Sequence, residues 1–203
     1  MNLKLFSLAL VIVLMTSVLF SAPPSSDGPY DRSTGAMMTV DYTHHEIHAG
    51  SHFFYTDSVE LTSAASQSYI IQTPPVASST KRAHLIITAD GSAITQFQLY
   101  EASDRNGVAT ATSQHSQREF VGLATSVVSI FKGVASGTTD GTLIWTYKGG
   151  AAAGASRTPV SIERDQELVL KPDTKYHLRV TSGTASNLTN VQFHWYEHTA
   201  KEN

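Results

Sequence analysis

The chain has 203 residues, no cysteine and a formal net charge of −3. Without cysteine, neither a disulfide nor a thiolate metal site can form, so stability has to come from packing, hydrogen bonds or oligomerisation. Lysine and arginine are scattered along the chain, which argues against the clustered basic face of a nucleic-acid-binding protein.

Residues 1–36 differ from the rest of the chain. Lys4 precedes an apolar run over Leu5–Phe20, and a spacer rich in Pro, Ser and Gly follows. This layout is typical of a secretory signal peptide, and the run is short for a membrane span of about 20 apolar residues. Three alternatives stay open: a cleaved signal, a retained anchor, or a dispensable extension ahead of a start at Met37 or Met38.

The segment Thr43–His52, THHEIHAGSH, contains four of the nine histidines. If residues 43–48 are extended, His44, Glu46 and His48 project from one face as a candidate ligand set for zinc or nickel. The segment does not match the HExxH pattern of zinc proteases, because its glutamate comes one position too late.

The remainder of the chain alternates between short β-rich runs and turn clusters. The predicted strands cover residues 68–73, 83–88, 94–100, 125–132, 142–148, 167–170, 176–181 and 191–197. We therefore expect residues 37–203 to form a single all-β domain, a jelly roll or β-sandwich of about eight or more short antiparallel strands.

Near the C-terminus, HWYEH places His194, Tyr196 and His198 on one face of a strand. Two neighbouring strands could bring histidines of both clusters together, which makes a metal site of His44, Glu46, His48, His194 and His198 one hypothesis. We favour the alternative that these side chains fill a polar interface, with no cofactor. A histidine cluster at a subunit contact would titrate between about pH 5 and 7, which predicts pH-sensitive assembly.

Aromatic residues crowd the same two ends of the chain. The simplest interpretation pairs the terminal segments with each other or places them at a symmetry axis, as assembly elements. The predicted interface residues are His44, His45, His48, His52, Phe53, Phe54, Trp195, Tyr196 and His198.

Other chemical motifs are weak. The chain has no G-x-S-x-G elbow and no P-loop. Asp165 and Glu167 could share a strand face like a glycosidase pair, but such residues beside Arg164 are typical of a solvated face. Residues 187–189, Asn-Leu-Thr, form an N-glycosylation sequon. We expect neither an enzyme nor a small-molecule substrate.

Four stretches resemble a family of small structural proteins of tailed bacteriophages: VDYTHHEIHAGSHFFYTDSVEL, DGSAITQFQLYEASDRNG, SGTTDGTLIWTYKGG, and DQELVLKPDTKYHLRVTSGTASNLTNVQFHWYEHTAK. The resemblance covers roughly residues 38–201. It implies a β-rich, non-enzymatic virion protein, most simply a capsid decoration or cement protein. Its partners would be the major capsid protein or other virion subunits and further copies of itself, with a homotrimer favoured. The alternative is a secreted β-sandwich that binds a glycan or receptor.

Overall fold

The computed structural model describes residues 42–119, 122–150, 160–161 and 167–199. These residues belong to one compact unit, Tyr42–Asn203. The predicted leader over residues 1–36, and Asp165, lie outside the described residues. Within the described ranges no helix is both long enough and apolar enough to cross a membrane.

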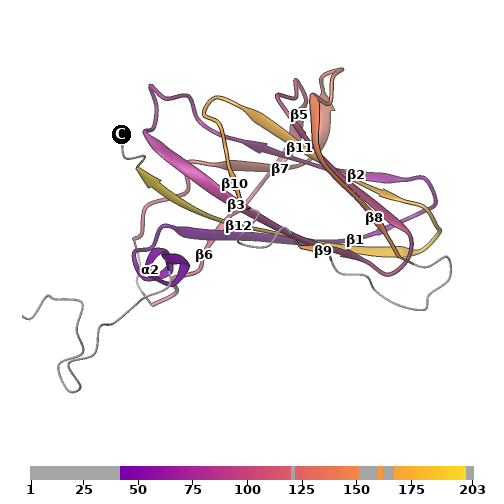
Figure 1. Cartoon of the computed structure of the whole chain (residues 1–203), viewed down its shortest axis with the longest axis horizontal. Helices are drawn as coiled ribbons and strands as arrows, with labels where there is room; N and C mark the ends of the chain where they lie inside the picture. The colour runs from indigo at the N-terminus through magenta and orange to yellow at the C-terminus, as the bar shows by residue number, and fades with distance from the viewer. Residues whose placement is uncertain (1–41, 120–121, 151–159, 162–166, 200–203) are drawn as a thin grey trace, which may run out of the picture. The chain divides into compact units, whose positions relative to one another are not determined.

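The described part of the unit contains two antiparallel β-sheets and one short helix, α2, over Tyr42–His48 (Figure 1). The first sheet follows the order β10 (Leu168–Val169), β3 (Lys81–Gly91), β12 (Asn187–Thr199), β1 (His52–Leu61) and β6 (Gln114–His115), and β9 (Val160–Ser161) also pairs with β3. The second sheet follows the order β5 (Asn106–Ala111), β7 (Ser129–Ser136), β2 (Ser66–Gln72), β11 (Lys175–Ser182), β4 (Thr95–Glu101) and β8 (Thr142–Gly149).

Strand pairing is nested from the ends of the domain inward. β1 pairs with β12, β2 with β11, β3 with β12 and β10, and β4 with β11 and β8. Two four-stranded runs, β1-β12-β3-β10 and β2-β11-β4-β8, result from this order, which is that of a jelly roll. β5, β6 and β7 come between β4 and β8 in the sequence. β6 extends the first sheet beside β1, and β7 and β5 extend the second sheet beside β2.

Alternation along the strands separates the core from the outer faces. From Arg82 to Gly91 the residues of β3 are alternately half-buried and buried, as a two-residue period requires. Inward side chains of both sheets form one hydrophobic cluster, which includes Phe53, Tyr69, Leu99, Leu178, Phe193 and Trp195.

The predicted all-β sandwich is confirmed, and each of the eight predicted strands overlaps an observed one. Three differences matter for the site. Residues 125–128 precede β7 instead of belonging to it, β1 was not predicted as a strand, and residues 43–48 are helical.

Candidate functional site

Helix α2 replaces the extended conformation on which the metal-ligand hypothesis for residues 43–48 depended. The helix ends in a Schellman motif, in which Ser51 N–H donates to Glu46 O and Gly50 N–H donates to Ile47 O. Gly50 occupies the required left-handed conformation, with φ of 72°. Because residues two apart in a helix point in different directions, the proposed alternation of His44, Glu46 and His48 on one face is wrong.

The two aromatic-rich segments are paired with each other through β1 and β12, which is one of the two arrangements that the simplest interpretation offered. β1 and β12 align His52 with Tyr196, Phe53 with Trp195, and Phe54 with His194. Phe53 and Trp195 stack in the core with ring centroids 5.8 Å apart, while their neighbours lie on the opposite face of the first sheet.

Burial divides the nine predicted interface residues into two groups. His52, Phe53, Trp195 and Tyr196 are at most 5% exposed within this single chain. They are therefore covered by the protein itself and offer no open surface to a second subunit. The other side chains with a described position are exposed or half-buried, namely His45, His48, Phe54 and His198. The side chain of His44 lies outside the described part of the chain.

His52 is the most strongly perturbed histidine at this end. Its Nδ1 lies 2.6 Å from Ser116 Oγ, and its ring lies 5.8 Å from that of His194. Burial, together with the charge of His194, lowers the pKa of His52 to about 4, although Glu46 opposes the shift. Burial also lowers the pKa of His194. Both imidazoles are thus held neutral near pH 7, which suits a packed polar layer.

A second histidine group lies on β3 and β12. His84 Nδ1 lies 2.9 Å from Glu167 Oε1, and the Tyr196 hydroxyl donates to the same carboxylate at 2.8 Å. His84 and His198 bring their Nε2 atoms to 2.8 Å. His84 was not among the predicted site residues, and Glu167 was considered only as a partner of Asp165. The pairing of β3 with β12 brings His84 next to His198, and the pairing of β3 with β10 brings Glu167 next to His84.

The metal-ligand set of the less favoured hypothesis does not assemble in the described residues. Glu46 lies on the buried side of α2, where its carboxylate accepts a hydrogen bond from the Ser51 hydroxyl, whereas His48 is exposed. His194 faces His52 and Phe54, while His198 faces His84. No three or more His, Asp or Glu side chains of the described ranges converge on a point that a metal could occupy.

Glu197, between the two histidines of HWYEH, points the other way and is 1% exposed. Its Oε1 accepts hydrogen bonds from Ser126 Oγ at 2.6 Å, Val127 N at 3.0 Å and Trp195 Nε1 at 3.1 Å. A buried carboxylate needs such donors, so Glu197 fixes the segment before β7 against the core.

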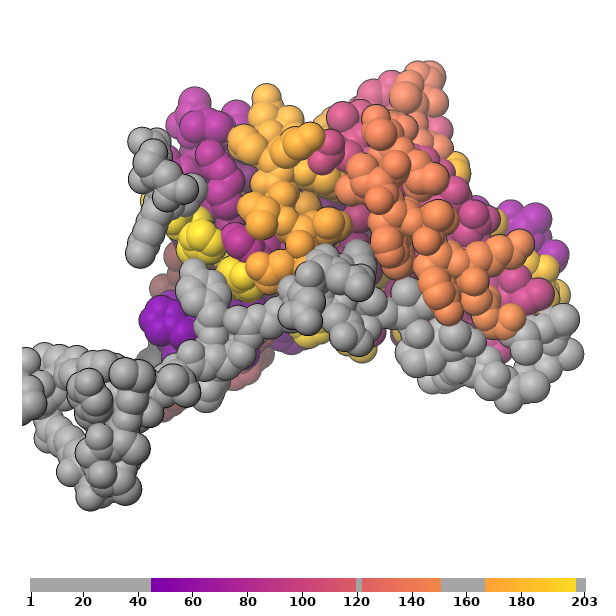
Figure 2. Space-filling view, viewed as in Figure 1, coloured from indigo at the N-terminus to yellow at the C-terminus, as the bar shows by residue number. Residues whose placement is uncertain are grey.

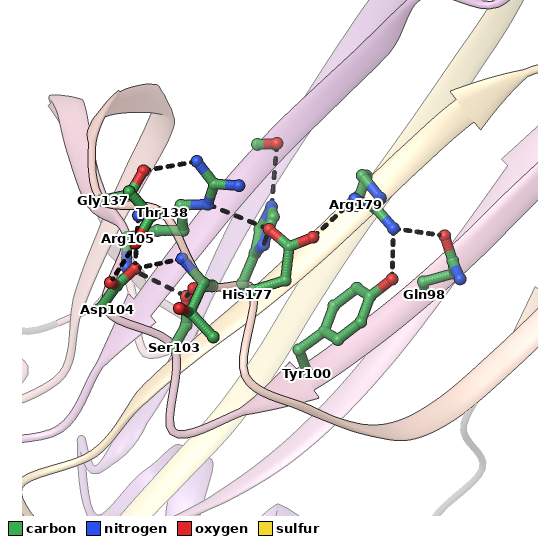
Figure 3. A network of polar contacts seen from close by, with 12 residues as sticks. Gln98, Tyr100, Ser103, Asp104, Arg105, Gly137, Thr138, His177 and Arg179 are labelled. Atoms are coloured by element: carbon green, nitrogen blue, oxygen red, sulfur yellow. Dashed lines mark hydrogen bonds and ion pairs between the residues drawn. The ribbon is translucent and has the colours of Figure 1, made fainter.

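A polar network on the outer face of the second sheet was missed by sequence reasoning (Figure 3). Asp140 pairs with Arg105 Nε at 3.0 Å and Arg179 Nη1 at 2.7 Å. Burial raises the pKa of Asp140, but the Arg105 hydrogen bond and the Arg179 charge outweigh it and leave the pKa below its usual value. Arg179 also lies over the Tyr100 ring, with Cζ 5.1 Å from the centroid.

This network joins two connections that cross the sheet, residues 102–105 and 137–141. Asp104 accepts backbone hydrogen bonds from Thr138 at 2.9 Å and Thr139 at 2.8 Å, while Arg105 Nη1 donates to Gly137 O at 2.6 Å (Figure 3). The contacts close both connections over the buried ring of His177, so their first effect is structural.

The same network contains serine, histidine and aspartate in the order of a hydrolase triad. His177 Nε2 lies 2.9 Å from Ser68 Oγ, and its Nδ1 lies 3.2 Å from Asp140 Oδ1. The second contact is not aligned as a hydrogen bond, and Asp140 is held by two arginines. Ser68 also lies within β2, where its backbone pairs with β11, unlike a nucleophile exposed on a sharp turn. The geometry therefore supports a structural role for this network, which holds the two connections together, better than a role for Ser68 as a nucleophile.

The asparagine of the glycosylation sequon, Asn187, is held by hydrogen bonds inside the fold. Asn187 is fully buried, and its Nδ2 donates to Ile94 O at 3.0 Å and Ser182 Oγ at 3.0 Å. Its Oδ1 accepts from Ala93 N at 3.0 Å. The folded chain therefore cannot present this amide to a glycosyltransferase.

Exposed apolar side chains gather on strands at the sheet edges. Leu143 and Ile144 on β8 are 46% and 42% exposed, Val108 on β5 is 66% exposed, and Val169 on β10 is 57% exposed. Figure 2 shows the β8 region, in orange, at the molecular surface. The β4–β8 register shifts between Leu99 and Tyr100, so Ile144 is the extra residue of a bulge.

No family model, curated protein or solved structure matches this chain.

Proposed function

We propose that this chain is a non-enzymatic structural protein of a bacteriophage particle, a decoration or cement protein that acts as a homo-oligomer on the capsid. The resemblance of its sequence segments to phage structural proteins supports this role. The jelly-roll order is compatible with it, since viral capsid proteins use that architecture, as do lectins.

The observation that carries the proposal is the apolar edge strand β8. Side-by-side exposed Leu143 and Ile144 on an edge strand are a liability in a free monomer, because unpaired strand edges and apolar patches promote association. β8 ends the second sheet in the described part of the chain, with β4 as its neighbour. A shell or a neighbouring subunit would cover this edge.

Contact at several edges suits a protein that stabilises a shell. Val108 on β5 and Val169 on β10 place further apolar contacts on other edge strands. Several weak contacts made at once give avidity well above that of each contact alone. An oligomer that bridges capsid subunits gains from this arrangement.

The test measures co-sedimentation of the purified chain with shells prepared without it. Wild-type protein is expected to bind, and the Leu143→Lys/Ile144→Lys double variant is expected to bind at least about tenfold more weakly, because it places two charges in an apolar contact. The control is Thr56→Lys, which adds a charge at an exposed position of β1.

Circular dichroism is the check that both variants are folded. Equal binding of the double variant and the wild type would remove β8 from the contact. Failure of the wild type to bind shells, combined with recovery of the protein from the medium as a glycan binder, would overturn the virion proposal in favour of a secreted binding module.

A further inference from the structure

β5 begins with an asparagine followed by a glycine, Asn106 and Gly107, and no other asparagine of the sequence precedes a glycine. The side-chain amide of an asparagine is open to attack by the backbone nitrogen of the next residue, which closes a five-membered ring. Glycine favours this attack because it has no Cβ to shield its backbone nitrogen. Asparagine is accordingly one of the thermolabile residues of proteins.

The fold requires glycine at position 107. A Cβ on Gly107 would overlap the Phe131 side chain on β7, so a larger residue cannot be placed there without a shift of the strand pair. The packing of β5 on β7 therefore selects the residue that leaves the Asn106 amide open to attack.

Asn106 also lies where the attack needs little opening of the structure. It is exposed, it is the first residue of β5, and β5 ends the second sheet in the described part of the chain. The register with β7 shifts between Asn106 and Gly107. The rotation that brings Gly107 N to Asn106 Cγ thus breaks one terminal pair of an edge strand, and such strand ends open at a low free energy.

Two side chains contact the Asn106 amide. Lys175 Nζ donates a hydrogen bond to Asn106 Oδ1, and Asn106 Nδ2 donates to Ser136 Oγ at 3.0 Å. The Ser136 contact holds the amide so that its oxygen faces the ammonium group. The ammonium group polarises the carbonyl and stabilises the negative charge that Oδ1 acquires when a nucleophile attacks Cγ.

We propose that Asn106 is a site of spontaneous deamidation and that Lys175 accelerates the reaction. The backbone nitrogen of Gly107 gives its proton to solvent and forms a bond to Asn106 Cγ. The Cγ–Nδ2 bond then breaks, and the amide nitrogen takes a proton from water and leaves as ammonia. A second water opens the cyclic imide at one of its two carbonyls, which leaves aspartate or isoaspartate at position 106.

The reaction changes the edge strand β5. Aspartate would replace the hydrogen bond to Lys175 with an ion pair, whereas isoaspartate adds one carbon to the backbone and displaces Gly107 from its pairing with Val134. The same strand carries the exposed side chain of Val108. Deamidation therefore adds a negative charge to a strand that also offers an apolar contact.

The test is incubation of the purified full chain in neutral buffer, followed by intact mass measurement and by peptide mapping that separates aspartate from isoaspartate. The expected result is the mass gain of one amide-to-acid exchange, located at Asn106. Asn190 is the internal control and should stay unchanged, because Val191 follows it. Asn106→Gln should not gain the mass, since its longer side chain would have to close a less favourable six-membered ring.

The matched variants Lys175→Met and Lys175→Arg test the role of the ammonium group. Lys175→Met should deamidate at least about threefold more slowly than the wild type, a modest effect because solvent screens this charge, and Lys175→Arg should stay near the wild type. In urea, where the chain is unfolded, all three rates should be equal. Absence of conversion at Asn106 in the folded wild type would overturn the proposal, as would equal rates for the folded wild type and Lys175→Met. Circular dichroism is the check that each variant is folded.

Discussion

His52 should make the protein less stable in acid. Its pKa is lowered from 6.5 to about 4 in the folded chain, mainly by burial. Between these values the unfolded chain binds a proton that the folded chain does not, so the free energy of unfolding falls as the pH falls from about 6.5 to 4.

The two pKa values set the size of this effect. Their difference corresponds to a loss of about 3 kcal/mol in the free energy of unfolding between about pH 7.5 and pH 4. Below the folded pKa the contribution of His52 becomes constant. His194 faces His52, and its pKa is lowered as well, so it adds a decrease of the same sign.

Urea denaturation followed by tryptophan fluorescence at a series of pH values measures this effect. His52→Asn removes the titration while leaving a polar group opposite Ser116, so its free energy of unfolding should fall by about 3 kcal/mol less over this range. The control is His48→Asn, a change at an exposed histidine, which should follow the wild type. An equal decrease in wild type and His52→Asn would refute the reasoning.

Two other contacts should dominate stability. Glu197→Ala removes a buried acceptor and leaves the Trp195 indole N–H and nearby amides without it, so we expect a loss of about 3 kcal/mol, measured by urea denaturation, and a loss below about 1 kcal/mol would contradict that role. Asp140→Asn weakens the ion pairs with Arg105 and Arg179, and their partial exposure limits the expected loss to about 2 kcal/mol. Because the pKa of Asp140 is lowered in the folded chain, its contribution is present above the ordinary pKa of aspartate and is lost as the pH falls. If the free energy of unfolding of Asp140→Asn depended on pH in acid as that of the wild type does, Asp140 would not have the structural role that we assign to it.

Local patterns were enough to predict eight of the twelve strands of the described residues. The alternation of residues 94–100 and 176–181 corresponds to β4 and β11, which lie side by side in the second sheet. β1 carried a usable signal that was not applied, since Phe53 and Leu61 lie on its buried face, four periods of the two-residue alternation apart.

Helix α2 shows where a local pattern was misread. Its length of seven residues gives little helical periodicity, and the histidines suggested alternation instead. The signal that was available is Gly50, which supplies the left-handed C-terminal cap.

The contacts of the candidate sites depend on register, which the sequence does not specify. His84 meets Glu167 and His198 only because β3 lies between β10 and β12. Asp140 meets Arg105 only because two connections cross the same sheet. Such pairs are separated by tens of residues and carry no local motif, so sequence reasoning found the histidines of β12 without their partners.

The most direct test of the proposed function is the protein content of phage particles purified on a density gradient from a culture of the source that encodes this chain. Mass spectrometry should find the chain in the particle band, at a fixed ratio to the major capsid protein. Recovery of the chain from the medium alone, with none in the particle band, would contradict the proposal.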